Sequence, residues 1–218
     1  VVRMGETPGG SSLTCWLRLY SPAGTLVDYS YAASAAEVEV TTATTGAYLL
    51  VVGDNTSGWV GTGGYRLTLA KTGSPVTVSP GDEGGPLTNG AVHTGTIDLG
   101  DLDLWTVEAT AGQALVLRMG QTDPGSSLTC WLRLYSPSGA LIDYSYAASA
   151  AEVEVTAPAS GTYLFVVGDN TSGWVGTGPY RITLAKTGSP VTVSPGDEGG
   201  PLTNGALQPG AIDLGDLD

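Results

Sequence analysis

The stretch Ser-Ser-Leu-Thr-Cys-Trp-Leu-Arg-Leu-Tyr-Ser-Pro occupies residues 11–22 and recurs unchanged at residues 126–137. From Leu13 to Leu19, every second residue is Leu or Cys, while Trp and Arg stand between them. This period of two is typical of a β-strand whose two faces differ in character. Ser-Pro-x-Gly follows in both copies and favours a turn. The stretch therefore predicts a strand that ends in a tight turn.

The repetition extends over the whole chain. Residues 1–103 align without a gap on residues 116–218, and 19 of these 103 positions differ, which leaves 84 identical. The offset of 115 residues matches the size of an independent domain, about 100–150 residues, and is far longer than the solenoid repeats of about 20–50 residues. We therefore expect globular units joined in a row.

Only residues 104–115 occur once, so the repeat is out of phase with the chain. We expect the chain to be a part of a longer tandem array of such units. The predicted parts are the C-terminal portion of one unit (1–72), a linker (73–80), a complete unit (81–187), a second linker (188–195) and the start of a further unit (196–218).

Within the complete unit, short β-like runs are separated by turn-forming residues at intervals of about 8–12 residues, as in an all-β sandwich or barrel. The expected strands cover residues 104–110, 113–119, 128–135, 140–146, 150–155, 163–167 and 179–186, with a short edge strand at 191–193. Residues 147–152 are the one candidate for a helical turn, and no long helix is expected.

Composition restricts the classes of function. The formal charge is −13, with 41% hydrophobic and 13% charged residues. These fractions favour a folded domain. The acidic surface disfavours nucleic acid and anionic membranes as partners. No apolar run reaches the ~20 residues that span a bilayer. A chain this acidic, rich in Thr, Ser and Gly and with only two lysines, suggests an extracellular bacterial protein.

The reactive residues do not form a catalytic set. The one histidine, His93, is replaced by Gln208 in the second copy, so no His-dependent chemistry belongs to the repeat. Cys15 and Cys130 occur once per unit on the apolar face of the predicted strand. We interpret them as buried thiols, with a disulfide between units or molecules as the alternative. We expect a protein that is not an enzyme.

The order of the motifs in the complete unit resembles that of the bacterial pre-peptidase C-terminal (PPC) domain family. The motifs are an acidic lead-in ending in Asn (196–204, with its copy at 82–89), Asp-Leu-Asp before an aromatic strand (101–105), Ala-Gly (111–112), Leu-Arg-Leu-Tyr-Ser-Pro-Ser-Gly (132–139), Gly-Thr-Tyr (161–163) and Tyr-Arg-Ile-Thr-Leu (180–184). The resemblance implies a jelly-roll-like antiparallel β-sandwich. It also implies a non-catalytic module of secreted proteins, in some members a binder of calcium or of polymers such as collagen.

The resemblance also implies a metal site. Ca²⁺ takes six to eight oxygen ligands from carboxylates and carbonyls, and acidic and Asn side chains supply such oxygens. The matching residues in the two copies are Glu83, Asn89, Asp101, Asp103, Glu198, Asn204, Asp216 and Asp218. The lead-in Asp-Glu-Gly-Gly-Pro-Leu-Thr-Asn departs from the family's compact Glu-Pro-Asn-Asn type. Ca²⁺ is thus the expected cofactor, and solvated turn carboxylates are the alternative.

Two further sets of residues are candidates for contacts. The aromatic residues on the polar face or in Gly-rich loops are Trp16, Tyr20, Trp59, Trp131, Tyr135 and Trp174. They predict packing between units, stacking on a glycan, or burial against a second sheet. Asn55 and Asn170 lie in Asn-Thr-Ser sequons, which predict either N-glycosylation or a simple turn.

These features favour a structural function. We expect a segment of an extracellular fibre, stalk or surface filament whose β-sandwich units associate head to tail and are stiffened by calcium. The alternative is a non-catalytic accessory module that anchors a secreted bacterial hydrolase to a polysaccharide or protein.

Overall fold

The structure, a computed structural model, describes all residues from 1 to 218. Residues 1–72, the N-terminal unit, form two antiparallel three-stranded sheets with the orders β4-β1-β6 and β3-β2-β5. The strands are β1 (Val2–Glu6), β2 (Cys15–Tyr20), β3 (Leu26–Ala32), β4 (Ala35–Val38), β5 (Leu49–Asp54) and β6 (Tyr65–Leu69). Val2, Met4, Cys15 and Leu17 are buried between the two sheets.

Residues 81–187, the complete unit, form a larger sandwich. Its strands are β7 (Gly84–Pro86), β8 (Val92–Ile97), β9 (Leu102–Ala109), β10 (Ala114–Gln121), β11 (Cys130–Tyr135), β12 (Leu141–Ala147), β13 (Ala150–Thr156), β14 (Gly161–Asp169) and β15 (Gly178–Lys186). The sheet orders are β12-β11-β14-β9-β7 and β13-β10-β15-β8. Only the pairing of β7 with β9 is parallel. A core of 21 buried residues fills the space between the sheets.

The predicted all-β, antiparallel class is confirmed. The seven long strands expected in the complete unit are present as β9 to β15, with ends shifted by a few residues. Residues 191–193 form no strand, so that prediction was wrong: the Thr192 N–H donates to the Asn89 carbonyl at 2.8 Å, just before β8, but no ladder of hydrogen bonds follows, and Val191 and Val193 are exposed. The helical turn suggested at residues 147–152 is also wrong, because β13 begins at Ala150 and the one helical turn is the 3₁₀ segment Ser57–Trp59.

Both thiols lie in apolar cores. Cys15 and Cys130 are free and fully buried, and each Sγ lies 3.3 Å from a backbone oxygen, that of Ser34 or Ser149. Burial raises the pKa of each thiol to about 11. The structure therefore contains two buried thiols, as the first interpretation predicts, and the chain holds no disulfide.

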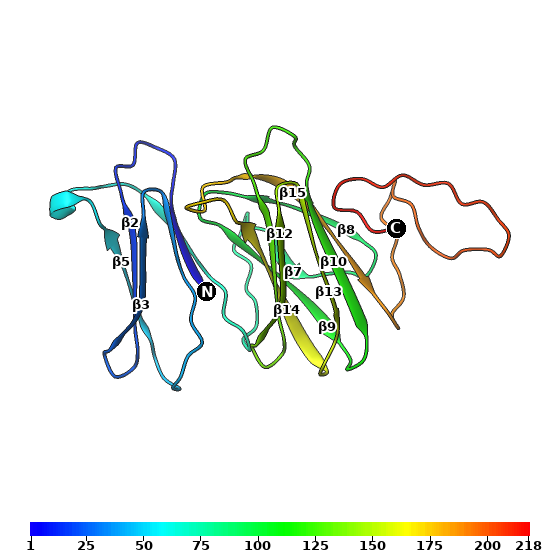
Figure 1. Cartoon of the computed structure of the whole chain (residues 1–218), viewed down its shortest axis with the longest axis horizontal. Coiled ribbons are helices and arrows are strands. Elements are labelled where there is room, and N and C mark those ends of the chain that lie inside the picture. Colours follow the sequence, from blue (N-terminus) through cyan, green and yellow to red (C-terminus); the bar gives the residue numbers. More distant parts are fainter.

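The four sheets are stacked in one direction (Figure 1). The outer face of β4-β1-β6 lies against the outer face of the five-stranded sheet, through ion pairs that join Arg133 to Glu37 and Glu39. Residues 188–218, the C-terminal segment, lie beyond β13-β10-β15-β8 at the far end of the stack, shown in orange and red. No helix in the structure has the length and apolar character needed to cross a membrane.

Candidate functional site

The contact between the two units, which we call the junction, arises from the period of two along the strands. On β1, Val2 and Met4 point into the N-terminal core, so Arg3 between them points outward. On β4, Ala36 and Val38 take the core side and leave Glu37 on the outer face. The same alternation on β11 and β14 presents a second outer face, and the two outer faces meet.

A buried network of charges forms the centre of the junction. The Nε of Arg3 donates to Glu37 Oε2 at 2.8 Å, and Nη1 of Arg133 donates to Glu37 Oε1 at 3.1 Å. Arg133 Nη1 also reaches Glu39, whose other oxygen accepts from the Tyr135 hydroxyl at 2.7 Å. The side chains of Arg3, Arg133 and Glu37 are 0%, 2% and 5% exposed. Burial lowers the pKa of Arg3, and Glu37 opposes that effect. Two arginines and two glutamates thus neutralise one another.

Aromatic rings complete the network. The guanidinium of Arg133 lies 3.9 Å from the ring centroid of Trp131, and that of Arg3 lies 5.6 Å from Trp131 and 5.8 Å from Trp174. Of the six aromatic residues predicted to make contacts, Trp131, Tyr135 and Trp174 therefore lie at the junction. Their copies Trp16, Tyr20 and Trp59 lie on the face of the N-terminal unit that nothing covers, and Trp59 is 73% exposed.

The loop between β8 and β9, residues 98–101, makes a second part of the junction. Arg66 of β6 pairs with Asp98 at 2.7 Å and with Asp101 at 3.0 Å. Gly5 lies directly against this loop, since a Cβ on it would come within 2.2 Å of the Leu99 carbonyl oxygen. Backbone thus meets backbone, with no room for a side chain.

The same contact occurs again at the other end of the chain. There, Arg181 pairs with Asp213 at 2.9 Å, and Nη1 of Arg118 donates to the Asp216 carbonyl at 2.9 Å, as Arg3 donates to the Asp101 carbonyl at 3.2 Å. Gly120 lies against Gly215 as Gly5 lies against Gly100. Equivalent residues of the two copies therefore make equivalent contacts with the segment that follows them.

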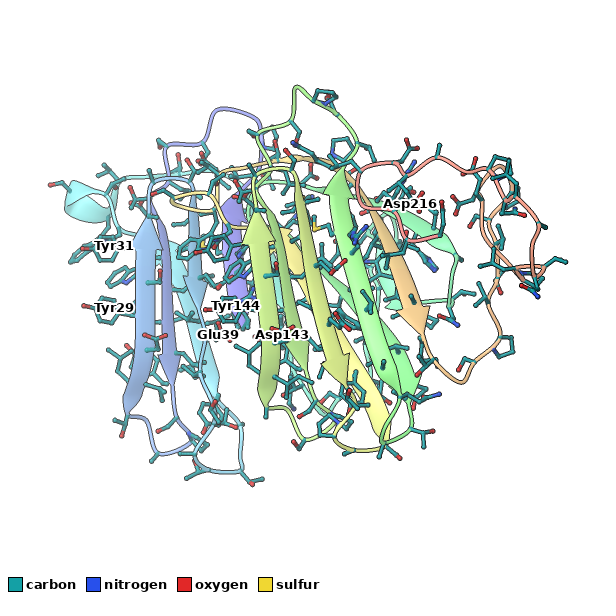
Figure 2. The ribbon with its side chains drawn as sticks, turned by 45° about the vertical axis from the view of Figure 1, so that its right-hand side comes forward. Tyr29, Tyr31, Glu39, Asp143, Tyr144 and Asp216 are labelled. Atoms are coloured by element: carbon teal, nitrogen blue, oxygen red, sulfur yellow. The ribbon has the colours of Figure 1, made fainter.

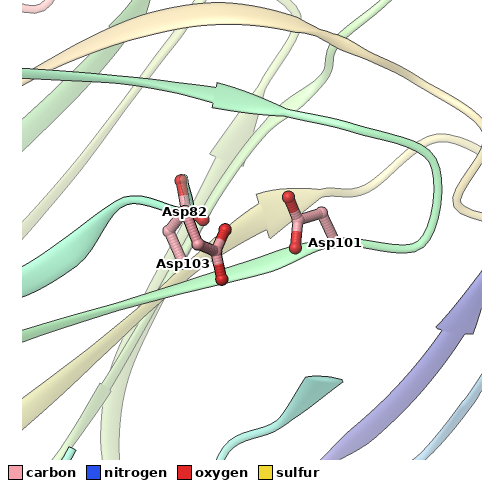
Figure 3. Close-up of side chains that lie close together, drawn as sticks. All are labelled: Asp82, Asp101 and Asp103. Carbon is pink, nitrogen blue, oxygen red and sulfur yellow. The ribbon is translucent and has the colours of Figure 1, made fainter. Parts of the chain in front are cut away.

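A group of three carboxylates lies beside the junction (Figure 3). Oxygens of Asp82, Asp101 and Asp103 all lie within 4.8 Å of one another. Asp82 and Asp101 line, with Arg66 and other residues of 76–83, a cleft of about 360 Å³. Asp103 is 0% exposed; its Oδ2 accepts from the Tyr180 hydroxyl at 2.5 Å, and its Oδ1 has no partner. Burial raises the pKa of Asp103 to about 8. An oxygen that is buried without a partner suits a hard cation such as Ca²⁺.

The predicted metal ligands are only partly together. Asp101 and Asp103 share the group, with Asp82 in place of its neighbour Glu83. Asn89 lies elsewhere: it accepts from the backbone N–H of Lys186 at 2.6 Å and donates to the carbonyls of Lys186, Ser189 and Pro190. Asn89 therefore fastens the linker that leaves the unit. In the second copy, the group is Asp197, Asp216 and Asp218, without Glu198 or Asn204.

The two sequons lie in the loops that follow β5 and β14. Asp169, next to Asn170, holds its loop by accepting from the backbone N–H groups of Thr129 (2.9 Å) and Gly176 (2.8 Å) and from the Thr171 hydroxyl. The loop places Trp174 in the left-handed region, at φ 50°. The aspartate rather than the asparagine shapes this loop, and the loop brings Trp174 to the junction.

Four residues of the junction were not predicted from the sequence: Arg3, Glu37, Glu39 and Arg133. A charged residue at alternate positions of a strand normally indicates a solvated face. One feature of the sequence could have indicated them: Arg133 lies on the same face of its strand as the aromatic residues Trp131 and Tyr135.

We expect Glu37→Ala to lower the free energy of unfolding by about 3–5 kcal/mol, because it leaves the buried guanidinium of Arg3 without a carboxylate partner and Arg133 with Glu39 alone. The repeat supplies a matched control. Glu152→Ala changes the equivalent residue, which pairs with Arg118 where both side chains are over a third exposed, and it is expected to cost about 1 kcal/mol or less. Denaturant unfolding at low protein concentration measures both. Equal losses for the two variants would contradict a buried junction.

No family model matches the sequence, and no curated protein is significantly similar to it. Among solved structures, the pre-peptidase C-terminal domain of a collagenase from Bacillus anthracis is 17% identical, with a TM-score of 0.39, over 47% of this chain and 95% of that domain. PliG of Aeromonas hydrophila, a periplasmic inhibitor of g-type lysozyme, is 18% identical, with a TM-score of 0.39, over 49% of this chain and 99% of that protein. Neither likeness identifies a function for the present chain.

Proposed function

We propose that this chain is a segment of an extracellular structural array, a fibre, stalk or surface filament, built from β-sandwich units and stabilised by calcium. One observation carries the proposal: equivalent residues form the same docking contact twice, with Arg3 on Asp101 and with Arg118 on Asp216. A contact repeated at the period of the sequence generates a regular array, because each unit meets the next in the same orientation.

The chemistry of the junction supports a fixed orientation. Purely apolar faces slide at little cost, whereas buried charges that lose their partners are expensive. The Arg3–Glu37–Arg133 network therefore favours one register between the units. The apolar side chains of Ala70, Leu102, Tyr135, Leu164 and Val166 are buried beside it and add area to the contact.

Calcium has a defined place in this proposal. Asp101 takes part in both the carboxylate group and the ion pair with Arg66 of the preceding unit. A cation held by Asp82, Asp101 and Asp103 would neutralise the acidic side of the cleft and keep Asp103 ionised. Extracellular calcium modules bind with dissociation constants of about 10⁻⁴–10⁻³ M, so the surrounding fluid would keep such a site filled.

The shape of longer arrays tests the structural function. Concatenated units, measured by small-angle X-ray scattering and electron microscopy, should form rods whose length grows in proportion to the number of units. With Arg133→Glu in every complete unit, the rods should become flexible strings, because the junction then holds three carboxylates and one guanidinium. A wild-type array whose dimensions grow as those of a flexible chain, with about the square root of its length, would refute the proposal.

Calcium binding is tested through the pH dependence of stability. In a chelator, the stability that Asp103 contributes should fall as pH rises from about 4 to about 8, because its folded-state pKa, about 8, lies above its ordinary value of 3.8 and the folded state alone holds the proton between those values. About 10 mM Ca²⁺ should then restore about 1.4–2.7 kcal/mol. Asp103→Asn should abolish both effects, and Asp123→Asn, in an exposed loop, should abolish neither. Calorimetry without a calcium heat would remove the metal from the proposal.

The alternative function, an accessory binding module, is favoured by one observation. Tyr29, Tyr31, Tyr144 and Tyr146 are 56–57% exposed in both copies, so the neighbouring unit does not cover them (Figure 2). Exposed aromatic rings suit stacking on a polysaccharide. Pull-down on insoluble polysaccharides, compared with the Tyr144→Ala, Tyr146→Ala variant, decides this point; retention by the wild type alone would favour the module.

A further inference from the structure

One surface of the repeat is covered in the complete unit, where it forms the junction, and uncovered in the N-terminal unit. We call the outer surface of β2 and β5, with Trp16, Arg18, Tyr20, Leu49 and Val51, the front face of the N-terminal unit. Its register pairs Arg18 with Val51 and Tyr20 with Leu49, as the complete unit pairs Arg133 with Val166 and Tyr135 with Leu164. Leu164 is 7% exposed at the junction, whereas Leu49 is 60% exposed. β14 also pairs with β9, whereas β5 pairs with β2 alone, so the front face is the uncovered β2 and β5 part of a junction half.

The complementary half lies at the other end of the stack. We call the outer surface of β10 and β13, with Arg118, Glu152 and Glu154, the back face of the complete unit. These residues are the copies of Arg3, Glu37 and Glu39, and they lie on strands paired in the same register, Arg118 opposite Glu152 as Arg3 is opposite Glu37. The side chains of Arg118 and Glu152 are 35% and 38% exposed, against 0% and 5% for Arg3 and Glu37. On the back face, Arg118 and Glu152 pair with each other, and no residue takes the place that Arg133 has at the junction.

The C-terminal segment already occupies its part of the back face. Asp213 and Asp216 contact Arg181 and Arg118 as Asp98 and Asp101 contact Arg66 and Arg3. In Figure 2, Asp216 lies beyond the last sheet, and Glu39 lies between the units. The surface around Glu152 and Glu154 stays open, and this is the part that β11 and β14 cover at the internal junction.

The space that Arg3 occupies at the junction is open at the equivalent place on the front face. At the junction, Arg3 Nη1 lies so close over Gly168 that a Cβ there would be 3.0 Å from it. The equivalent Gly53 on the front face has nothing within 4 Å of the same position. The position beside Gly53 on the front face is therefore open to Arg118 of another copy.

We propose that a second copy of this chain docks its front face on the back face of the first, in the register of the internal junction. Arg18 of one copy pairs with Glu152 and Glu154 of the other, and Tyr20 donates to Glu154. Arg118 lies between Trp16 and Trp59, as Arg3 lies between Trp131 and Trp174. This inference rests on the proposed array and assigns the surface through which separate chains extend it. The two faces differ, so the association is head to tail and does not close.

The experiment uses the full chain in sedimentation velocity over a wide range of concentration. The wild type should form a ladder of oligomers as concentration rises. Arg18→Glu and the double variant Glu152→Arg, Glu154→Arg should each be monomeric, with association weakened about thirtyfold or more. Asp123→Arg, a similar charge change in an exposed loop, should associate like the wild type.

Mixing the two blocked variants provides the decisive arm. The Arg18→Glu chain keeps an intact back face, the double variant keeps an intact front face, and the two altered faces carry opposite charges, so an equimolar mixture should regain the ladder of oligomers. This recovery also demonstrates that both variants are folded. A wild type that remains monomeric, blocked variants that associate normally, or a mixture that remains monomeric would each overturn the docking surface. Rigid rods of concatenated units would still support the array in that case, so the two proposals fail separately.

Discussion

The pairing of Glu37 with two buried arginines is the interaction on which the arrangement of this molecule depends. Each sandwich is held together by an apolar core, and apolar cores do not specify how one unit meets the next. The junction adds a charged and aromatic layer in which Glu37 pairs with Arg3 and with Arg133. Successive layers of the stack thus alternate between apolar interiors that give stability and a polar interface that gives orientation.

The duplication allows the effect of a neighbour to be separated from the effect of sequence. Tyr135 and Tyr20 have the same flanking residues and the same strand pairing, yet only Tyr135 is fully buried, with its hydroxyl bonded to Glu39. Tyr29 and Tyr144 do not differ in exposure. The neighbour therefore covers β11 and β14 and leaves β12 open, so one sheet offers both a docking surface and a free edge.

Much of the fold was predictable from the sequence, because period-two alternation and turn residues are local signals. β8 was missed because His93, Thr94 and Gly95 dilute its apolar pattern. Residues 191–193 were wrongly assigned because this Val-Thr-Val run makes one backbone hydrogen bond, to Asn89 just before β8, and forms no ladder. Asp101 and Asp103 were predicted as neighbours in a site, while Asp82 displaced Glu83 from the group. The arginines and glutamates of the junction were not predictable, since a charged strand face is normally solvated and only a second unit changes that.

The close approach of Gly5 to Gly100, and of Gly120 to Gly215, has a consequence for the shape of an array. At both places backbone faces backbone, so a methyl group on either glycine would push the two segments apart at that point. In the proposed array, a substitution at one of these two positions of a repeat would therefore tilt one unit against the next and bend the assembly there.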